Sequence, residues 1–239
     1  MLSGPALLPL VGLLGLVFGS FITALSYRLP RGQSTASGRS RCPACGTTLG
    51  AVDLVPVFSW IFFRGRCRHC GAPVHWRYPV IEAVTAGLFV TAAVVAASWP
   101  GLMVMLATVP VLVAIAVIGL EHGRVPDVLA LFLLAAMAAW RWIAHPAAPA
   151  VAPSLSSVMV LALGFAVIKL RPAVTTRAEV LLLAAAAMGL TGWQFVVLLG
   201  ALASVALIRG RTTRFLAPIF AVGVWVGLCA QEIGPSLAS

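Results

Sequence analysis

The chain has 239 residues, of which 61% are hydrophobic and only 9% are charged. A soluble domain usually carries about 25% charged residues, so this chain could not cover a water-facing surface and is expected in a lipid bilayer. Its net charge of +10 comes from basic residues that lie between apolar runs, as in cytoplasmic loops facing anionic lipid. We therefore expect membrane lipid, and no nucleic acid, as a partner.

Apolar runs predict an all-α polytopic membrane protein of about eight transmembrane helices, because a helix needs about 20 apolar residues to cross the hydrocarbon core. The runs cover residues 5–26, 80–98, 101–120, 127–142, 155–170, 180–190, 194–208 and 215–229. A break at Thr191-Gly192-Trp193 leaves two short halves, so residues 179–208 form either one span or two. The first run has no basic start and no small-residue cleavage site, which favours a retained helix over a signal peptide.

The distribution of Lys and Arg predicts the orientation of these spans. Eight of the sixteen lie in the polar stretch 27–78, which should be cytosolic and so places the N-terminus outside. Basic and uncharged loops alternate correctly along the rest of the chain only with eight spans, and the C-terminus then also lies outside. The expected organisation is a first helix over 1–26, a cytosolic zinc-binding module over 27–78 and a seven-helix membrane domain over 79–239.

Two C-x-x-C pairs lie in the predicted cytosolic stretch and together can complete a tetrahedral thiolate site. The cytosol keeps thiols reduced, which favours a metal over disulfides. Gly46 and Gly71 follow the pairs, where a tight turn needs a residue that tolerates positive φ. We predict a structural zinc ion with no open position; two disulfides or a redox pair is the alternative. The predicted ligands are Cys42, Cys45, Cys67 and Cys70.

Several further motifs follow one another between residues 18 and 82. They are Phe18-Gly19-Ser20-Phe21, Tyr27-Arg28-Leu29-Pro30, Cys42-Pro43-Ala44-Cys45, the stretch 53–60, Arg64-Gly65-Arg66-Cys67 and Arg77-Tyr78-Pro79-Val80-Ile81-Glu82. This ordered set resembles the prepilin leader peptidases, the intramembrane aspartic peptidases of type IV pilus and type II secretion systems. One departure is Thr23, where the family usually has Asn.

The resemblance implies a multi-pass protein of the bacterial inner membrane. Members of that family cut the leader from prepilins and pseudopilins at the cytosolic face, so the leader and N-terminal helix of such a protein would be the partner. Many members also methylate the new N-terminal amine with S-adenosylmethionine. No local motif in this chain indicates that second activity.

The resemblance also implies two catalytic aspartates at cytosolic helix ends, one activating water and the other polarising the amide. The first lies seven residues before a proline, and Gly119 occupies that position here. The second belongs to a Gly-x-Gly-Asp-x-Lys motif whose glycines and lysine are absent, and Glu179 is the nearest carboxylate. Glycine can neither activate water nor carry a proton. We therefore expect an inactive or impaired homologue that binds prepilins.

Two further glutamates, Glu121 and Glu82, lie outside the positions of the two family aspartates. Glu121 paired with Glu179 is the alternative source of peptidase activity, as a displaced dyad. In a regular helix, however, Glu121 points roughly 200° away from residue 119, and a misplacement of about 1 Å can cost about 100-fold in rate. Glu82 lies just inside the second predicted helix, and we expect it to orient or stabilise its surroundings, for example by pairing with Arg77.

Overall fold

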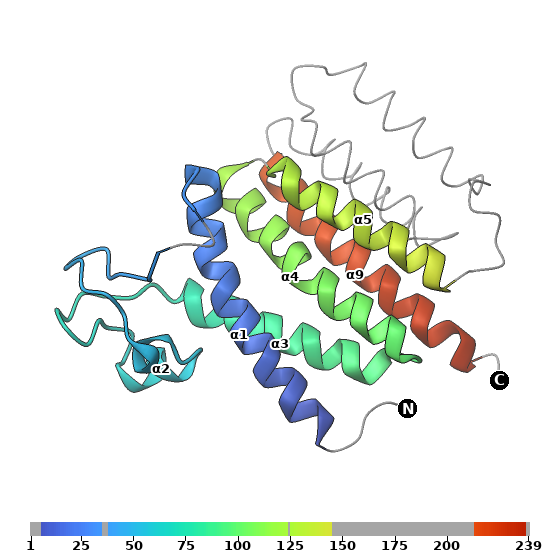
Figure 1. The fold of residues 1–239 in the computed structure, drawn as a ribbon, viewed down its shortest axis with the longest axis horizontal. Helices are drawn as coiled ribbons and strands as arrows, with labels where there is room; N and C mark the ends of the chain where they lie inside the picture. The colour runs from blue at the N-terminus through green and yellow to red at the C-terminus, as the bar shows by residue number, and fades with distance from the viewer. Residues whose placement is uncertain (1–5, 35–37, 124, 145–212, 238–239) are drawn as a thin grey trace. The chain divides into compact units, whose positions relative to one another are not determined.

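A computed structural model describes residues 6–34, 38–123, 125–144 and 213–237 (Figure 1). The described residues form helices joined by turns, with two isolated antiparallel bridges. In chain order the elements are α1 (Leu7–Arg28), η1 (Leu29–Arg31), η2 (Ala51–Leu54), α2 (Phe58–Phe62), α3 (Arg77–Val95), α4 (Trp99–His122), α5 (Asp127–Ala144) and α9 (Thr213–Leu237). The spans predicted over 155–170, 180–190 and 194–208 lie outside the described residues, and so does Glu179.

Three helices in the described part of the chain are long and apolar enough to cross a membrane. They are Leu7–Arg31, Arg77–Val95 and Trp99–His122, with mean hydropathies of 2.2, 1.7 and 2.7. Shorter apolar stretches, Asp127–Trp140 and Ala217–Ala230, lie in α5 and α9. The helical class and the membrane setting predicted from the sequence are thus confirmed, while the total of eight spans stays a prediction.

The chain divides into two compact units, and the division falls between Val94 and Val95. In the first unit, α1 packs against α3 through glycines. A Cβ built on Gly15 would lie 2.6 Å from the Cα of Ala86, and one built on Gly19 would lie 2.6 Å from the Cα of Glu82. Only glycine allows the two backbones to approach so closely, as at many helix contacts in membranes. This contact brings the middle of α1 level with the second turn of α3.

In the second unit, α4 packs against both α5 and α9. The Ser98 hydroxyl accepts a hydrogen bond from the Gly101 N–H at 3.2 Å and caps the start of α4. Gly123 ends the helix in the left-handed conformation at φ 68°, and its N–H donates to the carbonyl of Gly119. The helix is therefore continuous up to His122, and Gly119 and Glu121 both lie in its last two turns.

Candidate metal centre and the position of Gly119

The two C-x-x-C pairs form turns of the same construction, which we call the first and second knuckle (residues 40–49 and 65–74). In the first, the N–H of Cys42 donates to the Thr47 carbonyl at 3.0 Å, and the N–H of Gly46 donates to the Cys42 carbonyl at 2.9 Å. The second repeats this pattern 25 residues later at 2.8 and 2.9 Å. Gly46 and Gly71 adopt φ values of 71° and 72°, which confirms the predicted need for glycine at these turns.

The knuckles bring four sulfur atoms together. The Sγ atoms of Cys42, Cys45, Cys67 and Cys70 all lie within 4.8 Å of one another. Across the two knuckles, the Sγ atoms of Cys42 and Cys70 lie 3.9 Å apart. A tetrahedral zinc site with bonds of about 2.3 Å has sulfurs about 3.8 Å apart. The cluster therefore has the donor set and the size to hold a metal ion.

The thiols also differ in how readily they lose a proton. Hydrogen bonds to the side chain and backbone of Thr47 lower the pKa of Cys45 to about 6. The backbone hydrogen bond to Ala72 lowers the pKa of Cys70, but desolvation and the neighbouring cysteines raise it by more, to about 11. Thiolates this close repel one another, so Cys45 loses its proton at a lower pH than Cys70. A divalent cation among them would remove this conflict and favour all four thiolates.

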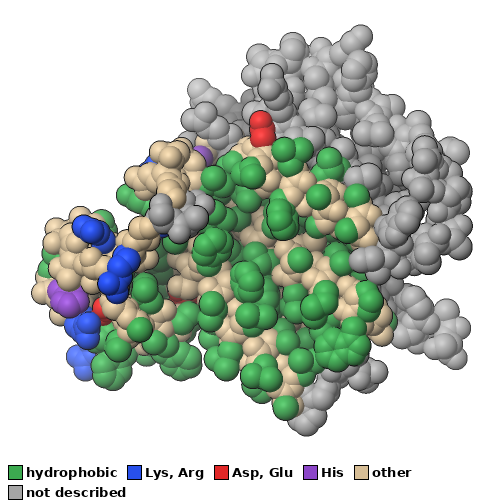
Figure 2. Space-filling view, viewed as in Figure 1, with side chains coloured by type: hydrophobic (Ala, Val, Ile, Leu, Met, Phe, Trp, Pro, Cys, Tyr) green, Lys and Arg blue, Asp and Glu red, His purple; other side chains and the backbone are tan. Residues whose placement is uncertain are grey.

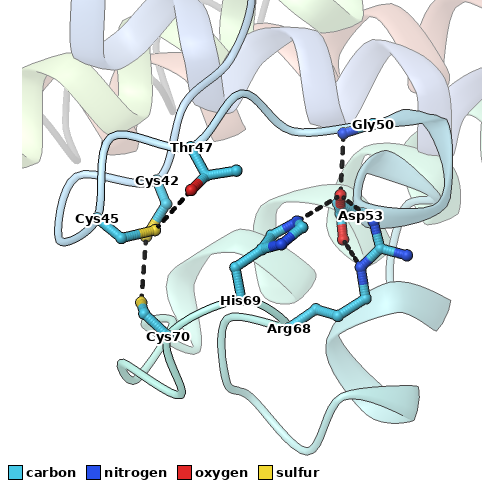
Figure 3. A network of polar contacts seen from close by, with 8 residues as sticks. All are labelled: Cys42, Cys45, Thr47, Gly50, Asp53, Arg68, His69 and Cys70. Atoms are coloured by element: carbon cyan, nitrogen blue, oxygen red, sulfur yellow. Dashed lines mark hydrogen bonds and ion pairs between the residues drawn. The ribbon is translucent and has the colours of Figure 1, made fainter.

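Asp53 ties the segment between the knuckles to the second knuckle (Figure 3). Its buried carboxylate accepts the Gly50 N–H at 2.9 Å and pairs with the guanidinium of Arg68 at 3.1 Å. His69 Nε2 lies 3.9 Å from the same carboxylate. Arg68 and His69 are the two residues between Cys67 and Cys70, so Asp53 holds the tip of the knuckle. Sequence reasoning missed this role, although Asp53 is the single acid in the basic stretch 27–78.

Glu82 joins the cysteine module to the membrane helices. Its Oε2 accepts the backbone N–H of Val57 at 2.7 Å, while Arg77 donates to the Ser26 hydroxyl of α1 at 3.0 Å. Val57 has φ 62° and ψ −51°, a sparsely populated positive-φ conformation that costs a β-branched residue of the order of 1–3 kcal/mol. The expected orienting role thus acts on the loop before α2, through a backbone partner that the sequence did not indicate.

Gly119, which the sequence comparison above predicts to occupy the first family aspartate position, is buried where α4 meets α9. A Cβ built on Gly119 would overlap the Cβ of Ala217, far inside any real contact between such atoms. Glu121, two residues later, is exposed, and Asp127 is exposed at the start of α5. The structure therefore places the two carboxylates away from the buried surface on which Gly119 lies. Whether either carboxylate serves in catalysis stays a prediction.

Comparison with known proteins points to one family. A family model described as the bacterial peptidase A24 N-terminal domain matches residues 13–96, which include α1 from residue 13 onward, both knuckles and α3. A prepilin leader peptidase/N-methyltransferase of Myxococcus xanthus is 40% identical over 124 residues, covering 52% of this chain and 37% of the relative. One of Bacillus subtilis is 32% identical over 137 residues, covering 57% and 55%.

A third relative carries a different description. It is a type 4 prepilin-like proteins leader peptide-processing enzyme of Escherichia coli, 35% identical over 147 residues, covering 52% of this chain and 53% of the relative. The chain thus spans between about a third and just over half of the length of these three relatives. No solved structure matches the chain.

Proposed function

Because the chain belongs to the prepilin leader peptidase family, we propose that it recognises the leader and N-terminal helix of a prepilin or pseudopilin without cutting it efficiently. The observation that carries this proposal is Gly119, whose place at the first aspartate position is packed against Ala217. An aspartic peptidase needs two carboxyl groups that share one proton and act together on the scissile amide. Removing one of them leaves no group to activate water.

The proposed topology keeps eight spans in the bacterial cytoplasmic membrane, with the cysteine module in the cytosol and both termini outside. Support comes from α1, α3 and α4, which have the length and hydropathy of spans. Further support comes from the eight arginines between residues 27 and 78, since cytoplasmic loops carry an excess of basic residues. The proposed parts remain a first helix to residue 26, the module over 27–78 and a membrane domain from 79 onward.

The proposed metal is a structural zinc ion held by Cys42, Cys45, Cys67 and Cys70. Four thiolates fill a tetrahedral shell and leave no position for water or substrate, so the ion would supply folding free energy and no catalytic step. The names of two relatives include N-methyltransferase. Methylation with S-adenosylmethionine is therefore a second activity to test in this chain, with no described residue that we assign to it.

A displaced dyad of Glu121 and Glu179 is the competing proposal, in which the chain still cuts prepilins. A cleavage assay separates the two. The purified chain would be incubated in detergent with a prepilin peptide that carries its leader, and the products would be read by mass spectrometry. The Bacillus subtilis relative would serve as the positive control. We expect product from the relative and none from this chain over the same time.

Two variants make the assay decisive. If the parent chain forms mature product and either Glu121→Gln or Glu179→Gln abolishes it, the displaced dyad is correct and the proposal of impaired cleavage is wrong. Product that survives both substitutions would also contradict the proposal, since another group would then perform the chemistry. Bound metal, measured in each preparation, shows that the cysteine module is folded in every sample compared.

A further inference from the structure

The cysteine module exposes an apolar surface that none of its described neighbours covers. We call this surface the α2 patch and define it by Leu54, Val55, Phe58, Ile61 and Phe62. Phe62 is 80% exposed, and Phe58 and Ile61 are each 61% exposed. Scattered single exposed apolar residues are ordinary, but a cluster of five within nine residues, two of them aromatic, is typical of a surface that binds something apolar.

The position of the α2 patch along the membrane helices indicates what that partner is. Val57, directly before α2, donates its N–H to Glu82 at 2.7 Å. Glu82 lies five residues into α3, about 7.5 Å along the axis from Arg77, at a rise of 1.5 Å per residue. On α1, Gly19 touches the same residue, and it lies nine residues, or about 14 Å, before Arg28. The start of α2 therefore lies near the first two turns of α3.

The helix ends provide the reference for depth. Arg28 is the last residue of α1 and Arg77 is the first residue of α3, and basic residues at the ends of membrane helices are expected near the lipid headgroups. Figure 1 shows α2 beyond the end of α3 at which Arg77 lies, and below the end of α1 at which Arg28 lies. A segment at this level, outside the helix pair, lies where headgroups meet acyl chains.

The charge around the α2 patch favours an anionic bilayer surface as its partner. Arg64 and Arg66 follow the patch directly, and residues 27–78 carry eight arginines. The single acid of this stretch, Asp53, is already paired with Arg68. Figure 2 shows basic side chains gathered at the left, over the segment between α1 and α3, next to hydrophobic ones. A second copy of this chain would bring the same positive charge, whereas an anionic bilayer surface complements it.

We propose that the α2 patch docks on the surface of an anionic phospholipid bilayer. Phe58, Ile61 and Phe62 enter the boundary between headgroups and acyl chains, as the apolar face of an interfacial helix does. Arg64 and Arg66 then lie at the level of the lipid phosphates. The bilayer surface thus fixes the cysteine module beside the Arg28 end of α1 and the Arg77 end of α3, whether or not the chain binds a prepilin.

Photocrosslinking tests this placement in the full chain. The photoreactive amino acid p-benzoylphenylalanine would replace Phe62 and, as a matched control, Gln33. Gln33 is also exposed, but its N–H donates to the Arg28 carbonyl at 3.1 Å, which holds it beyond the end of α1. Each protein would be placed in nanodiscs of phosphatidylglycerol and phosphatidylethanolamine and irradiated, and its adducts would be identified by mass spectrometry.

We expect lipid adducts at position 62 in severalfold higher yield than at position 33. Equal yields at the two positions, or adducts at position 62 that join it to a second copy or to an added prepilin peptide in place of lipid, would overturn the proposal. In nanodiscs without phosphatidylglycerol the yield at position 62 should fall, and an unchanged yield would rule out the anionic headgroup as the partner of the arginines. Equal bound metal in both proteins ensures that two folded modules are compared.

Discussion

Replacing Cys42 with serine should release the metal from the cysteine module and unfold the segment 38–76. The short segment has little apolar core, since Cys42 and Cys67 are its buried hydrophobic residues among those described. Its folding then depends on metal binding, which contributes about 10–16 kcal/mol in small four-ligand zinc domains. We expect bound zinc, measured by mass spectrometry of the metal, to fall from about one ion per chain to near zero.

Limited proteolysis reads the folding of the same variant directly. In the parent chain the second knuckle should resist trypsin, and in Cys42→Ser it should be cut rapidly at its arginines, Arg66 and Arg68. Cys229→Ser, a matched exchange in α9, should keep both the metal and the resistance. Retention of a full metal content by Cys42→Ser would contradict the four-cysteine site.

Introducing aspartate at the family position, as Gly119→Asp, should destabilise the chain and restore no cleavage. The added Cβ would overlap the Cβ of Ala217 on α9, so one of the two helices must move. Overpacking costs about 1–3 kcal/mol, and a buried carboxyl without a partner adds a comparable amount. We expect a lowered midpoint in thermal unfolding in detergent, and no mature product from a prepilin peptide.

Three further variants separate the effect of the Cβ contact with Ala217 from the effect of the buried carboxyl group. Gly119→Ala adds the Cβ alone and should already be destabilising, whereas Gly87→Ala on α3 has open space at its Cβ and should be neutral. Combining Gly119→Ala with Ala217→Gly should recover most of the lost stability. A stable Gly119→Asp that cuts prepilins would instead show that the helix pair can accept the catalytic residue.

The local features of this chain follow from its sequence because they depend on short-range rules. The spacing of the cysteines and the glycine after each pair predict the knuckles, and the structure contains both. The apolar runs predict the helices, but some ends differ. The run at 5–26 becomes Leu7–Arg28, and the run at 80–98 becomes Arg77–Val95. Basic residues at these ends continue the helix past the hydrocarbon core, so hydropathy alone misses them.

The contacts that pack α4 against α9 and tie the cysteine module to α3 join residues far apart in sequence. Gly119 faces Ala217, 98 positions later, and Glu82 binds the backbone of Val57. No periodicity or spacing indicates such a pairing, and a backbone N–H leaves no signature in the sequence at all. That Gly119 replaces an aspartate stays a prediction from the sequence, and its place in the packing of α4 against α9 is visible only in the structure.

Native mass spectrometry of the chain in nanodiscs with a full-length prepilin tests most directly whether this chain binds prepilins without cutting them. We predict a one-to-one complex whose prepilin component keeps the mass of the uncut protein, leader included. The mass of the mature pilin in the same spectrum would contradict the proposal of impaired cleavage. Free chain and free prepilin, under conditions in which the Bacillus subtilis relative binds the same prepilin, would contradict the proposal of binding.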